Sequence, residues 1–164
     1  MDRRNLMIGG AAAAALMPLM AGSLFAQEAT LDEAKLPALL GGNFATETSR
    51  LAREQATNPT VRTFADLEIA EQEATARAFG VEPGTGGLRE DHAAMLAELQ
   101  AATGAEFDRM YIQGQITGHE ELLQIHRTYA AEGTDPMARG ASMVGVPSIE
   151  THLAMLRGIE RQLG

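Results

Sequence analysis

The chain has 164 residues, a formal net charge of −9 and no cysteine. Its acidic surface repels nucleic acid and anionic lipid, so neither is expected as a partner. The lack of cysteine excludes disulfides, thiolate metal ligands, a cysteine nucleophile and lipoprotein attachment.

Residues 1–26 have the pattern of an export signal, with a short basic start followed by an uncharged stretch rich in alanine, glycine, leucine and methionine. The pair Arg3-Arg4 resembles a twin-arginine signal, and an ordinary secretory signal that carries two arginines is the alternative. Cleavage is expected after Ala26, with Ser23 as the rival position. An uncleaved anchor is a further alternative, because the apolar run approaches the roughly 20 residues that span a bilayer.

Export predicts a periplasmic protein, either free or loosely associated with the membrane, and no stable membrane span after signal cleavage. Residues 27–35 then lead into a single helical domain over residues 36–164, in which helix-forming residues dominate and no strand-like alternation appears. Four long helices are predicted, at residues 31–56, 60–79, 105–131 and 136–163. The first is expected to bend at Pro37 and Gly41-Gly42.

The last of these helices is expected to break near Gly145 and Pro147, because proline cannot donate to the helical hydrogen-bond ladder. A Gly/Pro-rich loop at residues 81–87 and a short helix at residues 91–104 make the connection between the second and third long helices the longest. A single long crossover is the ferritin-like layout. The sequence therefore predicts an all-α, ferritin-like four-helix bundle with one long crossover that contains a short helix.

The third long helix carries polar residues on its apolar face. On a helical wheel its charged residues share one side, whereas Gln115, His119 and His126 lie near the middle of the apolar arc. These three side chains are predicted to point into the bundle. His126 is interpreted as a satisfied, partly exposed histidine. His92, at the start of the short helix, is interpreted as part of a helix cap.

Other helices repeat this pattern. Glu68 lies close to the centre of the apolar arc of the second helix, with Gln72 beside it and Glu71 nearer the edge. His152 falls within the apolar stripe of the fourth helix, and Glu47 lies at the border of the first. Three helices thus direct a titratable group toward the bundle axis.

A buried carboxylate must find a partner or become neutral, because an isolated buried charge is costly. Glu68 with His119 or His152 would form an ion pair or a charge-assisted hydrogen bond, and such a network could act only to fix the register of the helices. The same three side chains, with Gln115 and Glu47 as weaker candidates, could instead bind a divalent metal such as iron, manganese, zinc or copper. No phosphate-binding glycine loop, nucleophile elbow or His-Glu-x-x-His motif is present.

Residues 36–163 resemble an exported bacterial family known as domain of unknown function 4142, whose members are expected to be ferritin-like four-helix bundles. The specific markers are "FD…Y", "GHEELL" and "HL", carried by Phe107, Asp108, Tyr111, His119 and His152. Many members have Asp-His in the second helix where this chain has Glu71-Gln72, which removes one ligand here.

The ferritin-like resemblance implies a di-iron centre, but the ligand pattern does not match. Carboxylate di-iron bundles use Glu-x-x-His on two helices. Ile116 and Ile149 stand three residues before His119 and His152, where these motifs need glutamate. Ferroxidase activity is therefore not expected.

Two functions remain open on the sequence. The first is a non-enzymatic protein of the cell envelope, structural, stress-related or binding, with an envelope protein or a second copy of itself as partner. The second is a metal-binding or oxidase-like protein that uses the cluster of Glu68, His119 and His152.

Overall fold

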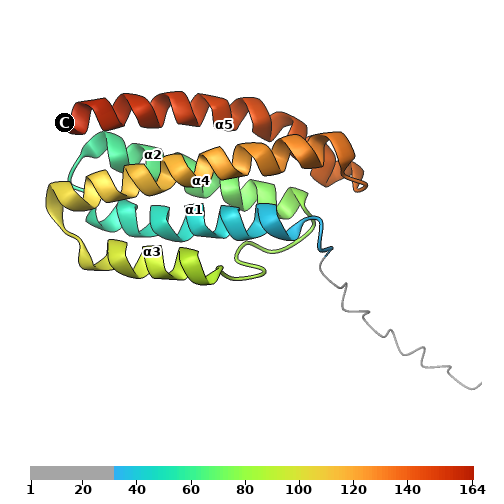
Figure 1. Ribbon diagram of the computed structural model, residues 1–164, viewed down its shortest axis with the longest axis horizontal. Helices are drawn as coiled ribbons and strands as arrows, with labels where there is room; N and C mark the ends of the chain where they lie inside the picture. Colours follow the sequence, from blue (N-terminus) through green and yellow to red (C-terminus); the bar gives the residue numbers. More distant parts are fainter. Residues whose placement is uncertain (1–31) are drawn as a thin grey trace, which may run out of the picture. The chain divides into compact units, whose positions relative to one another are not determined.

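The computed structural model describes residues 32–164, which form five α-helices and contain no strand (Figure 1). They are α1 (Leu36–Gln55), α2 (Pro59–Ala78), α3 (Glu90–Ala101), α4 (Gly104–Glu132) and α5 (Pro136–Leu163). The all-α prediction is confirmed for this part of the chain. The predicted export signal lies outside the described residues. Between residues 32 and 164, no helix has the length and apolar character that a membrane crossing requires.

Four of the helices form a bundle, and α3 packs on its outside. α1 pairs with α2 and α4 pairs with α5, while α1 also contacts α4 and α2 also contacts α5. The connection from α2 to α4 runs back along the bundle and carries α3, which packs against α1 and α4 (Figure 1). The predicted long crossover with a short helix is therefore present. The closer likeness to ferritins remains a prediction.

Local sequence signals start two of the bundle helices. Before α2, the side chain of Asn58 accepts a hydrogen bond from the backbone N–H of Thr60 at 2.8 Å, and Pro59 begins the helix. Before α5, the carboxylate of Asp135 accepts from two backbone N–H groups in the first turn. These caps satisfy N–H groups that have no partner within the helix.

α1 begins at Leu36, later than the predicted residue 31. The predicted bend at Pro37 is not needed, because Pro37 lies in the first turn, where its missing N–H has no helical role. The helix continues through Gly41 and Gly42. A Cβ atom on Gly41 would lie 2.7 Å from Cδ2 of Leu122, so this glycine allows α4 to pack closely against α1.

The predicted interruption of the last helix is wrong, since α5 is continuous through Gly145 and Pro147. Pro147 removes one N–H donor, and the carbonyl group that loses its partner belongs to Met143. Both Pro147 and Met143 are exposed, so water can bind that carbonyl. Proline is tolerated here because it lies on the solvent-exposed face of the helix.

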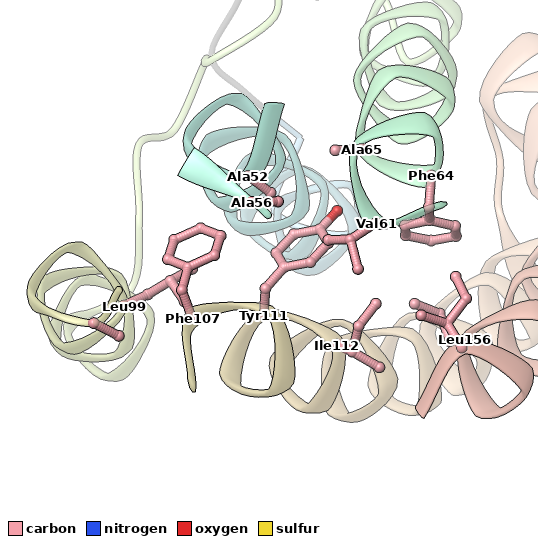
Figure 2. Packing of buried hydrophobic residues seen from close by; sticks show 12 residues of the cluster. Ala52, Ala56, Val61, Phe64, Ala65, Leu99, Phe107, Tyr111, Ile112 and Leu156 are labelled. Atoms are coloured by element: carbon pink, nitrogen blue, oxygen red, sulfur yellow. The ribbon is translucent and has the colours of Figure 1, made fainter. Parts of the chain in front are cut away.

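Apolar side chains fill the two ends of the bundle. Figure 2 shows one cluster, in which side chains from all five helices meet around Phe64, Phe107 and Tyr111. A second cluster contains Phe79 and Tyr129 and lies farther along α2 and α4. Apart from Asp108 near the start of α4, the buried polar residues of these two helices fall between the two clusters, near the middle of the bundle.

Polar contacts at both ends set how the helices are aligned. The carboxylate of Asp108, at the start of α4, accepts hydrogen bonds from the backbone N–H groups of Thr57 and Asn58 at 3.0 and 2.9 Å. At the other end, Nζ of Lys35 lies 2.5 Å from Oδ2 of Asp135 and also donates to the C-cap carbonyl of α2. These contacts fix α4 relative to α2 and α5 relative to α1.

Candidate metal centre

The alignment brings Glu68 of α2, His119 of α4 and His152 of α5 together in the core. Oε2 of Glu68 lies 3.2 Å from Nε2 of His119 and 3.1 Å from Nδ1 of His152. The two ring nitrogens lie 3.3 Å apart. Three potential ligand atoms thus form a nearly equilateral triangle, with one corner from each of three helices.

The outer nitrogens of both rings face acceptor groups. Nδ1 of His119 lies 2.8 Å from the backbone carbonyl oxygen of Gln115. Because a carbonyl oxygen only accepts, Nδ1 carries the hydrogen, and Nε2 of the neutral ring directs its lone pair into the triangle. Nε2 of His152 lies 3.4 Å from Oε2 of Glu71, which favours the hydrogen on that nitrogen and a lone pair on Nδ1. In metal sites, such partners orient ligating histidines.

The Glu68 carboxylate is oriented in turn by its neighbours. Its other oxygen, Oε1, accepts a hydrogen bond from Nε2 of Gln72 at 2.9 Å. A Cβ atom on Gly42 would lie 2.7 Å from Oε1 of Gln72, so the absence of a side chain on Gly42 makes room for this amide. A glycine on α1 therefore helps to position a carboxylate on α2.

The cluster lies in an apolar environment. Glu68 and His119 are 0% and 1% exposed, and the ring of Phe64 contacts that of His152 edge-on, with centroids 5.4 Å apart. Burial alone would raise the pKa of Glu68. In the metal-free protein, protonated imidazoles that donate hydrogen bonds to the carboxylate outweigh burial and hold this pKa well below its usual range. Burial would lower the pKa of His152, yet the hydrogen bond to Glu68 and the charges of Glu68 and Glu71 raise it.

The spacing of the three atoms fits a single metal ion. Ligands about 2.0–2.1 Å from an ion lie about 3.0 Å apart in octahedral and about 3.4 Å apart in tetrahedral geometry. The observed separations of 3.1, 3.2 and 3.3 Å lie between these values. Two imidazoles and one carboxylate are a ligand set that binds Zn²⁺ and Fe²⁺.

The same residues do not fit a di-iron centre. Such a centre needs a bridging set of carboxylates with Glu-x-x-His on two helices. Here the cluster contains one carboxylate, and Ile116 and Ile149 occupy the positions before its histidines. A mononuclear site is the arrangement that these side chains can form.

The two weaker candidates lie elsewhere. The side-chain amide of Gln115 donates to Oγ1 of Thr48 at 2.8 Å, so it faces α1 while its backbone carbonyl serves His119. The side chain of Glu47 is 40% exposed and pairs with Arg50 at 2.7 Å. Neither side chain belongs to the triangle.

The interpretations of the two other histidines are corrected. His126 is buried, not partly exposed, and its Nδ1 lies 3.0 Å from Oγ of Ser142. His92 is not a cap, because α3 has Arg89 at its N-cap. Its ring is buried and stacks on Phe44 with centroids 4.4 Å apart, which joins α3 to α1.

Sequence reasoning missed Ser148. Its hydroxyl donates to the carboxylate of Glu71 at 2.8 Å and thereby fixes the group beside His152. The spacing of four residues between Ser148 and His152 places both on one face of a continuous helix. Spacing along one helix does not show that Glu71 of α2 lies opposite Ser148, so the sequence alone could not assign this role.

Fold and site together define a helical bundle with a buried Glu/His cluster capable of holding one metal ion. A family model described as a domain of unknown function, DUF4142, matches residues 32–159, and the chain belongs to this family. Comparisons with curated proteins and with solved structures gave no match.

Proposed function

We propose that this protein binds one divalent transition-metal ion in the core of its bundle, through Glu68, His119 and His152. The observation that carries the proposal is the orientation of the two rings. Their outer nitrogens face the carbonyl of Gln115 and the carboxylate of Glu71, so their lone pairs converge on Oε2 of Glu68. A cation satisfies all three acceptors at once.

The enclosure of the cluster supports binding over catalysis on a large substrate. Glu68 and His119 are 0% and 1% exposed and His152 is 9% exposed, so a large substrate cannot reach the triangle directly. We therefore propose a non-enzymatic role in which the ion is held, or supports electron transfer, within the bundle.

A second function is a purely structural network. The separations of 3.1 and 3.2 Å around Oε2 of Glu68 are also hydrogen-bond lengths, and a proton on His152 would satisfy the carboxylate. In that state, Nε2 of His119 either accepts a hydrogen bond from the protonated Nδ1 of His152 or carries a proton of its own. The network would then fix helix register without binding a ligand.

Metal titration separates the two functions. Metal-free protein is titrated with Zn²⁺ and with Co²⁺, and its melting temperature is measured with and without excess ion. We expect binding with a higher melting temperature, since zinc at about 100 times its Kd adds about 2.7 kcal/mol. His119→Ala and His152→Ala should each lower the affinity at least about 100-fold.

His126→Ala is the matched control, because His126 is equally buried on α4 but lies outside the triangle. This variant should bind as tightly as the wild type. An unchanged melting temperature of the wild type on addition of divalent ions supports the structural network instead. Elemental analysis of protein purified from its own compartment without chelator identifies the natural metal.

We also propose that the protein is exported to the periplasm. The support is the pattern of residues 1–26, with Arg3-Arg4 before an uncharged apolar stretch. N-terminal sequencing of protein from the periplasmic fraction should begin at Gln27. Lysines in place of both arginines should block export by the twin-arginine route, whereas an ordinary secretory signal would tolerate them.

A further inference from the structure

The three ligand side chains differ in how close they lie to the surface. Those of Glu68 and His119 are 0% and 1% exposed, while that of His152 is 11% exposed. Its outer nitrogen, Nε2, faces Glu71, whose side chain is one-third exposed. The side of the cluster nearest to solvent is therefore the edge of His152 that lies beneath Glu71.

A groove between α2 and α5 is lined by Glu71, the acid that lies beside this edge. Its volume is about 310 Å³, and small residues keep it open: Ala74, Ala78, Ala141 and Gly145. Ser148 also lines it. On the opposite side, the hollow that Gln115 lines between α3 and α4 measures only about 60 Å³. The groove at Glu71 thus offers the wider approach to the cluster.

The charge of Glu71 suits a cation. Among residues 32–164, its carboxylate contacts the hydroxyl of Ser148 and the ring of His152, and it forms no ion pair with lysine or arginine. The neighbouring acid Glu73, by contrast, is bound by Arg50 and Arg77. Glu71 therefore lines the groove with a carboxylate whose oxygens are available to a divalent ion.

We infer that the metal ion enters and leaves the cluster through the groove between α2 and α5, with Glu71 as the carboxylate that binds it first. This inference rests on the proposed metal-binding function. The ring of His152 contacts Glu71 through one nitrogen and Glu68 through the other. A movement of this single ring therefore connects the groove with the buried carboxylate.

The test is the rate of Co²⁺ exchange, followed by the visible absorption of the bound ion in stopped-flow experiments. Ala74→Leu narrows the groove from an exposed position on α2 and touches no ligand. We expect it to slow uptake and chelator-driven release alike, about ten-fold, with little change in Kd. Glu71→Gln should slow uptake by about the same factor.

Two variants on the same helix serve as controls. Ala70→Leu adds the same bulk at an exposed position that does not line the groove, and Glu73→Gln removes the same charge outside it. Both should exchange cobalt at the wild-type rates. Circular dichroism of each variant verifies that the bundle is folded.

The outcomes are distinct. If Ala74→Leu and Ala70→Leu exchange cobalt equally fast, the ion does not pass through this groove. If Glu71→Gln accelerates release and leaves uptake unchanged, Glu71 only orients His152 and is not the first ligand. If the wild type binds cobalt and the variants give either of these results, this inference alone is overturned. A wild-type protein that takes up no cobalt overturns the proposed function as well.

Discussion

His119 and His126 lie on the same strip of α4 and are equally buried, yet they have different surroundings. His119 faces a carboxylate and a second imidazole, at 3.2 and 3.3 Å. Among residues 32–164, the side chains that His126 contacts include the hydroxyl of Ser142 and the ring of Phe79, and no acid is paired with it. Burial is therefore common to both histidines, and their neighbours alone make one of them a candidate ligand.

The electrostatic consequences of the two regions are opposite. Around His126, burial lowers the pKa to about 4, so this ring is neutral in the folded protein at physiological pH. In the cluster, Glu68 and Glu71 overcome burial and raise the pKa of His152. Burial favours the neutral form of a histidine, and a neighbouring carboxylate favours the charged form.

The largest expected effect is acid destabilisation through His126. Between pH 6.5 and 4, His126 is protonated in the unfolded chain and stays neutral in the folded protein. The free energy of unfolding therefore falls as the pH drops through this window. Between pH 7 and 4 the wild type should lose about 3 kcal/mol more than His126→Gln. Urea denaturation at both pH values measures this difference.

The stability contributed by His152 has the opposite sign, because its pKa is raised in the folded state. Its contribution is present below pH 6.5 and is lost as the pH rises through the folded pKa. In metal-free protein, His152→Gln should therefore lose more stability at pH 6 than at pH 8. Equal pH dependence of the His126 and His152 variants would contradict the contrast between the two regions.

The next effect concerns Glu68, the acid that is present beside His119 and absent beside His126. In metal-free protein, Glu68→Leu should lower the free energy of unfolding by about 2 kcal/mol, because both imidazoles and Gln72 lose their partner. Glu68→Gln keeps an acceptor for Gln72 and a donor for an imidazole, and should cost about 1 kcal/mol. Denaturant titration compares the two, and equal costs would argue against hydrogen bonding at this position.

A smaller effect is expected at the glycine that makes room for the cluster. Gly42→Ala places a Cβ atom 2.7 Å from Oε1 of Gln72 and forces this amide away from Glu68. Gly140→Ala, on α5, meets no atom within 4 Å and should stabilise its helix by up to about 1 kcal/mol. Thermal melts should show Gly42→Ala to be less stable than Gly140→Ala by about 1 kcal/mol or more.

The smallest effect is expected on the outer surface of α4 and α5. Arg127 and Glu150 form an ion pair at 2.7 Å, with side chains 47% and 52% exposed. Water screens this pair, so Arg127→Ala should change the free energy of unfolding by about 0.5 kcal/mol or less. A larger loss, measured by denaturant titration, would show that surface charges matter to the bundle as much as the buried cluster does.

Much of this architecture was predictable because it depends on spacing along single helices. The 3.6-residue period placed Glu68, His119 and His152 on inward faces, and all three are buried. Proline and glycine signals were less reliable. Pro147 was expected to interrupt α5, but a proline on a solvent-facing position leaves only an exposed carbonyl without a partner.

By itself, the sequence determined an all-α chain with polar groups on the buried faces of three helices, because such periodicity is a property of each helix alone. It did not determine which of these groups meet. The tertiary structure decided that, through long-range contacts such as Asp108 of α4 with Thr57 before α2 and Gly41 of α1 with Leu122 of α4. A shift of one turn, about 5.4 Å, would preserve every inward face and still separate the acid from both imidazoles.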